Sequence, residues 1–278
     1  MNKCIACGAD ASRHVFNENN YDWLRCMNCG LLYASVREKT INDKVAGEYD
    51  SIQEFSSSRE KIFCRELKTI KKIINKGLLL DVGCGTGIFI KQARDEGYSV
   101  QGIEPDMNYY EYAVKRTGVP VIKGFLRDIK ADNKYDIITY WDVLEHTPDP
   151  KNELVNVKKH LKDKGVLVLR VPSSGYALLK AFIMRNFLKT GKHKILDPPE
   201  HLFYFSKTAI LRLLDDAGFK VIKIKPGRSM IPAEISARII KGWLFYLSKL
   251  IYFISYGKIN FVIDITIYAM KSKFVYGK

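Results

Sequence analysis

The chain has 278 residues, enough for one ordinary catalytic domain with a small appendage. Hydrophobic residues at 47% and charged residues at 27% argue against a disordered chain and against a polytopic membrane protein. The net charge of +15 is concentrated in residues 151–278, which carry 24 Lys and Arg against 8 Asp and Glu. This excess favours anionic partners, such as a nucleotide diphosphate, a nucleic acid or an anionic membrane surface, without choosing among them.

The first segment of the chain carries two pairs of cysteines. Cys4 and Cys7 are separated by 18 residues from Cys26 and Cys29, a spacing typical of a tetrahedral four-cysteine zinc site. Because no apolar run of the secretory type is present here, we expect a reducing cytoplasmic compartment, where disulfides are disfavoured. The spacing therefore predicts a structural zinc ribbon over residues 1–35, with a redox pair or chance core cysteines as the alternatives.

Residues 36–64 are polar and are expected to form a linker that turns helical toward its end. Strand-like and helix-like runs then alternate, which predicts an α/β domain with a parallel sheet over residues 65–278. The predicted strands are 78–82, 99–103, 135–139, 166–171, 220–225 and 264–271. The predicted helices are 88–96, 109–116, 151–161 and 207–217.

A glycine-rich turn follows the first of these strands and opens a helix. Its glycines, Gly83, Gly85 and Gly87, let the backbone pass close to a ligand at the carboxyl end of the strand. Glu104 ends the next strand, 21 residues after Gly83, where it would accept hydrogen bonds from a ribose diol. A dinucleotide site is the rival, but the turn is GxGxG rather than GxGxxG. Asp81 ahead of it suits a cofactor with a cationic amino-acid portion and no pyrophosphate.

These motifs resemble those of the class I S-adenosylmethionine methyltransferases. The resemblance rests on the DVGCGTG run from Asp81, on Glu104, and on the YDII and WDVLEH runs that begin at Tyr135 and Trp141. It covers about residues 65–225. It implies a Rossmann-like, mostly parallel seven-stranded sheet with helices on both faces, and an S-adenosylmethionine-dependent methyltransferase.

The resemblance also implies roles for individual residues. Asp81, Gly83 and Gly85 would surround the methionine end of the cofactor, and Glu104 would hold the ribose hydroxyls. Asp128 matches the acidic position near the adenine amino group. The full set of predicted cofactor-binding residues is Asp81, Gly83, Cys84, Gly85, Gly87, Glu104, Asp128, Trp141 and Asp142.

Methyl transfer from a sulfonium depends mostly on alignment, so a base is needed only where the acceptor must lose a proton. His146 and His201 are the candidate bases, and Glu200 precedes His201. The cysteine module together with the Glu200–His201 pair resembles the zinc-containing sugar C-methyltransferases, in which the matching residues are proposed to act in acid–base steps at a keto sugar. The alternative is that His201 packs the turn into the next helix.

A second cluster of polar residues follows the 135–139 strand. Asp142, Glu145 and His146 bring two carboxylates and an imidazole within five positions, a set that could coordinate a divalent ion. Quinone-biosynthetic O-methyltransferases resemble this stretch, and such an ion would acidify a catechol acceptor. The alternative is that the motif only shapes the substrate side of the pocket.

Two apolar stretches occur in the basic half. Residues 176–189 are predicted to form a basic amphipathic helix within an insertion at 175–205, and a more apolar helix is predicted at 237–257. Both are expected to pack on the sheet. The alternative is peripheral contact of 176–189 and 239–256 with the anionic cytoplasmic face of a membrane that carries a lipid-linked acceptor.

The leading prediction is a methyltransferase acting on a small-molecule or lipid-linked acceptor, with a saccharide, a nucleotide sugar, or a polyprenyl or quinone-type compound as the candidates. One alternative is an RNA or protein methyltransferase that docks through the ribbon and the basic half, although no RNA motif supports a nucleic-acid partner. Another is a non-catalytic cofactor-binding scaffold. The sequence leaves open which atom is methylated and how many chains assemble.

Overall fold

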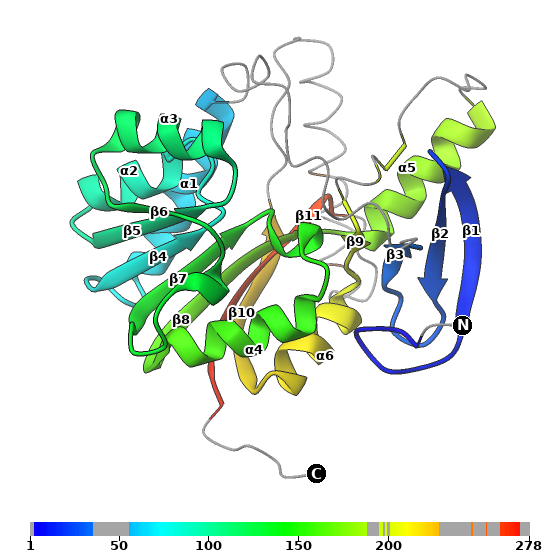
Figure 1. Ribbon diagram of the computed structural model, residues 1–278. Helices are drawn as coiled ribbons and strands as arrows, with labels where there is room; N and C mark the ends of the chain where they lie inside the picture. Colours follow the sequence, from blue (N-terminus) through cyan, green and yellow to red (C-terminus); the bar gives the residue numbers. More distant parts are fainter. Residues whose placement is uncertain are drawn as a thin grey trace.

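The computed structural model describes residues 3–35, 56–187, 195–196, 198, 201–227, 246, 254 and 262–272. A seven-stranded sheet forms the centre of the molecule (Figure 1). Its strands are β4 (Leu78–Val82), β5 (Ser99–Glu104), β6 (Val121–Lys123), β7 (Tyr135–Trp141), β8 (Leu161–Pro172), β10 (Phe219–Gly227) and β11 (Asp264–Lys271). They lie in the order β10-β11-β8-β7-β4-β5-β6.

The sheet is mostly parallel, as predicted. β4 pairs in parallel with β5 and with β7, and the same direction continues to β6 on one side and β8 on the other. Only β11 runs antiparallel to its neighbours β8 and β10. The predicted Rossmann-like sheet with seven strands is therefore confirmed, and the carboxyl ends of β4, β5, β7 and β8 meet at one edge, where such sheets bind ligands.

Helices cover both faces of the sheet (Figure 1). One face carries α1 (Ser56–Lys71), α2 (Ile88–Asp95) and α3 (Met107–Thr117), whose apolar side chains share a core with β4, β7 and β8. The other face carries α4 (Pro150–His160) and α6 (Lys207–Asp216). Side-chain oxygens begin three of these helices: Asp106 caps α3, Asp149 caps α4 and Ser206 caps α6.

The N-terminal segment builds a second, smaller sheet. Its strands are β1 (Ser12–Glu18), β2 (Tyr21–Cys26), β3 (Leu32–Ala34) and β9 (Phe203–Tyr204), in the order β1-β2-β3-β9. Asn19 and Asn20, both at positive φ, form the two-residue turn between β1 and β2. The fourth strand comes from a distant part of the chain, so this ribbon sheet is completed by the main domain.

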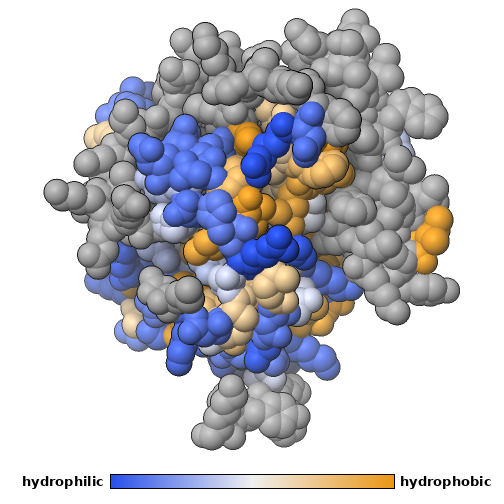
Figure 2. All heavy atoms as spheres, turned by 90° about the vertical axis from the view of Figure 1, so that its right-hand side faces the viewer, coloured by the Kyte–Doolittle hydropathy of each residue, from blue (hydrophilic) through white to orange (hydrophobic). Residues whose placement is uncertain are grey.

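Helix α5 (Ser174–Phe187) packs against the ribbon sheet. Trp23 is fully buried in a core that includes Phe16 of β1 and Ala177 and Ala181 of α5. A groove of about 430 Å³ runs along this seam, between Phe16 and Phe182. Figure 2 shows this side of the molecule, where apolar surface gathers between hydrophilic side chains.

The predicted and observed elements differ in two short strands, and some predicted elements lie outside the described residues. The sequence did not predict β6 or β9, which have three and two residues. Residues 36–55 of the expected linker and nearly all of the expected helix at 237–257 lie outside the described residues. Among the residues that the structure describes, no helix is long and apolar enough to cross a membrane.

Candidate functional site

The three glycines of the turn after β4 have left-handed backbone conformations. Gly83, Gly85 and Gly87 have φ of 68°, 53° and 77°. A Cβ at Gly83 would lie 2.6 Å from a methyl carbon of Val143, and one at Gly87 would lie 2.5 Å from a methyl carbon of Thr117. A Cβ at Gly85 would meet nothing within 4 Å. Gly83 and Gly87 thus permit close packing, whereas among the described residues Gly85 faces open space that a ligand could fill.

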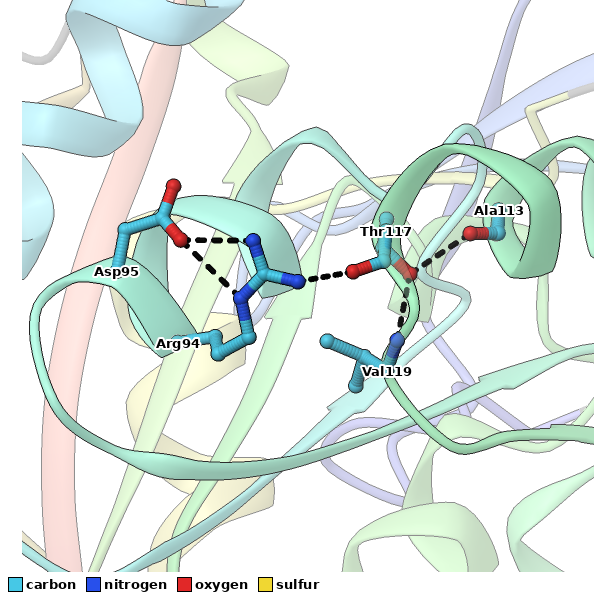
Figure 3. A network of polar contacts seen from close by, with 5 residues as sticks. All are labelled: Arg94, Asp95, Ala113, Thr117 and Val119. Carbon is cyan, nitrogen blue, oxygen red and sulfur yellow. Dashed lines mark hydrogen bonds and ion pairs between the residues drawn. The ribbon is translucent and has the colours of Figure 1, made fainter.

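A polar network connects the carboxyl-terminal ends of α2 and α3 (Figure 3). The Arg94 guanidinium donates to the Thr117 carbonyl oxygen at the end of α3 and also pairs with Asp95. The Thr117 hydroxyl donates to the Ala113 carbonyl oxygen (2.7 Å) and accepts from the Val119 amide (3.1 Å). Because Gly87 packs against Thr117, this network holds α2, α3 and the turn together.

Two buried carboxyl groups lie beside the turn. The Glu104 side chain is 5% exposed and accepts from the amides of Gly85 (2.7 Å) and Asp106 (3.0 Å). Asp81 is 2% exposed and accepts from the Thr139 hydroxyl (2.6 Å). Burial raises the pKa of Glu104, and it raises the pKa of Asp81 to about 8. The structure therefore brings together Asp81, Gly85 and Glu104, as the sequence predicts.

The other predicted cofactor-binding residues have different surroundings from Asp81 and Glu104. Cys84 is buried with its sulfur against Gly102, and burial raises the pKa of its thiol. Asp128 is exposed and accepts from the Phe125 amide (2.8 Å) at the start of η2 (Leu126–Asp128). Trp141 ends β7, and its ring lies 5.4 Å from Phe63 and 5.0 Å from Phe89. Trp141 therefore belongs at least in part to the core under α1 and α2.

Asp142 is held by an ion pair. The Arg170 Nε atom donates to its Oδ1 atom (2.6 Å), and a guanidinium nitrogen contacts Oδ2. Burial opposes ionisation of Asp142, but Arg170 and then Arg59 outweigh it and lower the pKa of this carboxyl. Asp142 has a φ of 57°, a left-handed conformation that aspartate tolerates better than most residues.

Glu145, His146 and His201 form a second cluster near the carboxyl end of β7. Each offers one ligand atom, and these atoms lie within 4.8 Å of one another. Glu145 is 1% exposed, and among the described residues neither of its carboxyl oxygens has a hydrogen-bond partner. The buried Nδ1 atom of His201 has no partner either, and the two imidazole rings are 4.8 Å apart.

The electrostatics of this cluster favour uncharged side chains. Burial, followed by the charge of Asp142, raises the pKa of Glu145 well above its usual range. Burial, followed by repulsion from His146, lowers the pKa of His201 to about 4. The neutral His201 imidazole, and a Glu145 carboxyl that would lose its proton to a bound cation, are suitable ligands for a divalent cation.

The structure thus groups these residues differently from the sequence analysis. The sequence placed Asp142 with Glu145 and His146, because the three are close in the chain. In the structure Arg170 occupies both Asp142 oxygens, and His201 takes the third place beside Glu145 and His146. Glu200, the other predicted catalytic residue, lies outside the described residues.

Several polar residues near this cluster were not predicted, because no sequence motif includes them. Within the part of the chain that the structure describes, the Arg170 Nη1 atom and the hydroxyls of Ser173 and Thr266 are buried without a partner. Arg170 and Thr266 face each other across the β8–β11 pair. Burial raises the pKa of Asp264, at the start of β11, to about 7. These residues come from strands far apart in the sequence, and only the sheet pairing brings them to one place.

The four cysteines also converge. Their sulfur atoms lie within 4.8 Å of one another, with Cys4 3.6 Å from Cys29 and Cys7 3.6 Å from Cys26. A disulfide requires about 2.05 Å, whereas a tetrahedron with zinc–sulfur bonds of about 2.3 Å has edges of about 3.8 Å. A hydrogen bond from the Cys29 thiol lowers the pKa of Cys4 to about 5. The geometry fits a four-cysteine metal site.

Comparison with known proteins gives a consistent result. A family model for a methyltransferase domain matches residues 55–224. The ubiquinone biosynthesis O-methyltransferase of Pasteurella multocida is 29% identical over 183 residues, which are 57% of this chain and 75% of that protein. The Rickettsia canadensis protein of the same name is 24% identical over 161 residues, 55% and 66% of the two chains. The Rickettsia conorii protein matches over 38% of its length, so the chain spans less than two thirds of both Rickettsia relatives.

Solved structures share the fold. Magnesium protoporphyrin IX methyltransferase from Synechocystis has a TM-score of 0.56 and 14% identity, covering 84% of this chain and 91% of its own. An S-adenosylmethionine-dependent methyltransferase from Archaeoglobus fulgidus has a TM-score of 0.55 and 21% identity, covering 81% and 100%.

Proposed function

The chain belongs to the family of methyltransferase domains, and we propose that it is an S-adenosylmethionine-dependent enzyme that methylates a hydroxyl oxygen of a small catechol-type acceptor. The observation that carries this proposal is the buried Glu145 carboxyl, which has no partner in the described part of the chain and lies beside His146 and His201. The ubiquinone biosynthesis O-methyltransferases among the relatives support an oxygen acceptor.

We assign the cofactor to the turn after β4. The open space beside Gly85 admits a ligand, and the carboxyl groups of Asp81 and Glu104 lie next to it. Asp81 would attract the cationic methionine end, and Glu104 would accept from the ribose hydroxyls. Structures of the Synechocystis methyltransferase are described with S-adenosylmethionine and with S-adenosylhomocysteine bound, which supports the same ligand class here.

The acceptor side would bind a divalent cation. Glu145, His146 and His201 would hold it, since their ligand atoms already lie close together and the Glu145 oxygens have no other partner. Such an ion lowers the pKa of a coordinated hydroxyl group and so prepares it for methyl transfer. An imidazole with a pKa of about 4 is a weak base at neutral pH but a good neutral ligand, so His201 fits metal binding better than proton abstraction.

Two further assignments concern the rest of the molecule. We assign zinc to Cys4, Cys7, Cys26 and Cys29, where it would stabilise the ribbon without taking part in the reaction. We also assign peripheral membrane contact to α5, because Phe182 and Ile183 are 60% and 43% exposed beside Arg185. The other segment assigned to this contact, 239–256, is described only at two exposed residues, Tyr246 and Ile254.

The test uses the full chain, methyl-labelled S-adenosylmethionine and two acceptor probes, 3,4-dihydroxybenzoate and a nucleotide keto-sugar. Mn²⁺ binding is followed by electron paramagnetic resonance. We expect one bound Mn²⁺, label transfer to the catechol, and at least tenfold weaker Mn²⁺ binding after Glu145→Gln. The control is Glu153→Gln, because that side chain only accepts from the Tyr140 hydroxyl (2.6 Å) and the amide retains the acceptor oxygen.

Each outcome decides between the candidates. Transfer to the keto-sugar alone would favour the sugar C-methyltransferase alternative. If Glu145→Gln binds Mn²⁺ and methylates the catechol as well as Glu153→Gln does, the divalent site is wrong.

A further inference from the structure

The segment from His201 to Ser206 is shared between the two sheets. The Leu202 amide donates to the Glu145 carbonyl oxygen (3.0 Å), and the Leu202 carbonyl accepts from the Ala34 amide at the end of β3 (3.0 Å). β9 then pairs with β3. The Phe205 amide returns to the main domain and donates to the Pro172 carbonyl oxygen (2.8 Å). Main-chain bonds therefore attach this segment alternately to the ribbon and to the acceptor side of the site.

Side chains strengthen the attachment to the ribbon. The Tyr204 ring packs edge-on against Trp23, with centroids 5.6 Å apart. The centroid of the same Tyr204 ring also lies 5.6 Å from the centroid of the His201 imidazole. The buried Trp23 indole and the candidate ligand His201 are thus linked through one aromatic side chain.

The cysteine cluster contacts the far end of the segment. The Ser206 hydroxyl donates to the Cys29 carbonyl oxygen and accepts from the Ala209 amide (2.9 Å), so one side chain joins the cysteine turn to the start of α6. Gly30 packs so closely here that an added Cβ would lie 3.2 Å from the Ser206 Cβ. The buried side chains of Cys29 and Phe205 belong to one continuous core.

The cofactor side is organised without the ribbon. Asp81 receives its hydrogen bond from Thr139, and Glu104 receives its two from Gly85 and Asp106, all within the main domain. A change at the interface between the ribbon and β9 should therefore leave the cofactor residues in place.

We propose that the four-cysteine ribbon positions the acceptor site: it takes β9 as its fourth strand, holds Ser206 against Cys29 and Gly30, and so sets His201 beside Glu145 and His146. This inference rests on the proposed role of His201. Gly30 and Ser206 are positioning residues, because they contact neither cofactor nor acceptor. The ribbon is then an integral part of the active site as well as a metal-binding appendage.

A matched pair of glycines provides the test. Gly8 and Gly30 occupy equivalent places after the two cysteine pairs, with φ of 71° and 75°, so alanine costs similar backbone strain at either. Only at Gly30 does the new Cβ meet Ser206, since nothing lies within 4 Å at Gly8. We would compare Gly30→Ala with Gly8→Ala by amide hydrogen exchange of residues 201–206 and by the position of the His201 ring-proton resonance at fixed pH.

Gly30→Ala is expected to speed exchange of the Leu202 and Phe205 amides at least tenfold and to shift the His201 resonance, while Gly8→Ala leaves both unchanged. Both variants should bind zinc and S-adenosylmethionine like the unaltered protein. Equal exchange and equal resonance positions in the two variants would overturn the proposal. These readouts require no acceptor and no divalent ion, so they decide it even if catechol methylation fails.

A second pair covers the case in which Gly30→Ala loses its metal or fails to fold. Ser206→Ala removes the hydroxyl that joins Cys29 to α6, whereas Ser206→Thr retains a hydroxyl there. We expect faster exchange and a shifted His201 resonance in the alanine variant and rescue of both in the threonine variant. Where 3,4-dihydroxybenzoate is methylated, Ser206→Ala should raise its KM and leave the KM of S-adenosylmethionine unchanged. No difference between the two Ser206 variants would contradict the positioning role.

Discussion

Two sides of the large sheet differ in how some of their buried polar groups are bonded. On the β4–β5 side, the Glu104 carboxyl accepts from two amides and Asp81 accepts from the Thr139 hydroxyl. On the β7–β8–β11 side, the Glu145 carboxyl and the Thr266 hydroxyl are buried without a partner within the described structure. The buried carboxyls beside β4 and β5 thus have partners, Thr139 of β7 among them, whereas Glu145 and Thr266 have none among the described residues. We call these two sides the cofactor half and the acceptor half, after the ligands proposed for them.

Under the proposed function, this difference implies that the two ligands are recognised in different ways. A buried polar group without a partner costs about 1–3 kcal/mol, so unmatched atoms concentrated in one region indicate groups that a bound molecule or ion satisfies. The cofactor half holds its groups in place before binding. In the acceptor half, unpartnered buried groups lower the stability of the fold and remain available to a ligand. Substitutions there should therefore change stability, whereas substitutions in the cofactor half should change cofactor binding.

The largest expected effect is on the Arg170–Asp142 pair, which stabilises the acceptor half. Arg170→Met removes the guanidinium and leaves the Asp142 carboxylate without its counter-charge, which should lower the free energy of unfolding by about 3–5 kcal/mol. Urea unfolding measures this change. The double variant Arg170→Met/Asp142→Asn, which also removes the orphaned charge, should recover most of the loss. A loss below about 1 kcal/mol in the single variant would show that the pair is not essential.

The cofactor half could be predicted because its residues lie close together in the sequence. Asp81, Gly83 and Gly85 lie within one strand and the turn after it, and Glu104 ends the next strand. A run of buried apolar residues followed by glycines specifies both the fold and the ligand side of that segment. The alternation of strands and helices predicted a parallel α/β sheet, and the resemblance to the class I methyltransferases implied its seven strands.

The acceptor half was predicted only in part, because distant segments build it. Glu145 and His146 lie on the short helix η3 (Leu144–His146), but His201 comes from a distant part of the chain, just before β9. β9 has only two residues, too few for a recognisable sequence pattern. In the sequence, Arg170 is an isolated charged residue within an apolar strand. Its role is apparent only from the structure, where it forms an ion pair with Asp142. Long-range pairing of this kind has no counterpart in local periodicity.

The next effect separates cofactor binding from stability within the cofactor half. Gly85→Ala and Gly97→Ala both place alanine at positive φ, 53° and 92°, with nothing within 4 Å of the new Cβ. Only the space beside Gly85 is assigned to the cofactor. Gly85→Ala should therefore weaken S-adenosylmethionine binding about 100-fold, or about 2.7 kcal/mol, while Gly97→Ala leaves it unchanged. Calorimetric titration measures both, and equal affinities would place the cofactor elsewhere.

The smallest effect concerns protonation of Asp81. Its pKa in the ligand-free fold is about 8, above the unfolded value of 3.8, so the folded state binds the extra proton and its stability falls as pH rises from about 4 to about 8. The cationic cofactor favours the ionised carboxylate, so S-adenosylmethionine affinity should rise between pH 6 and pH 8, by at most about tenfold per unit. Asp81→Asn cannot ionise. It should bind the cofactor weakly at every pH in this range and, at pH 8, unfold a few degrees higher than the ligand-free unaltered protein. Parallel titrations and thermal melts at pH 6, 7 and 8 measure both trends. A pH-independent affinity in the unaltered protein would mean that Asp81 is already ionised in the fold and that its burial is offset by groups other than Thr139.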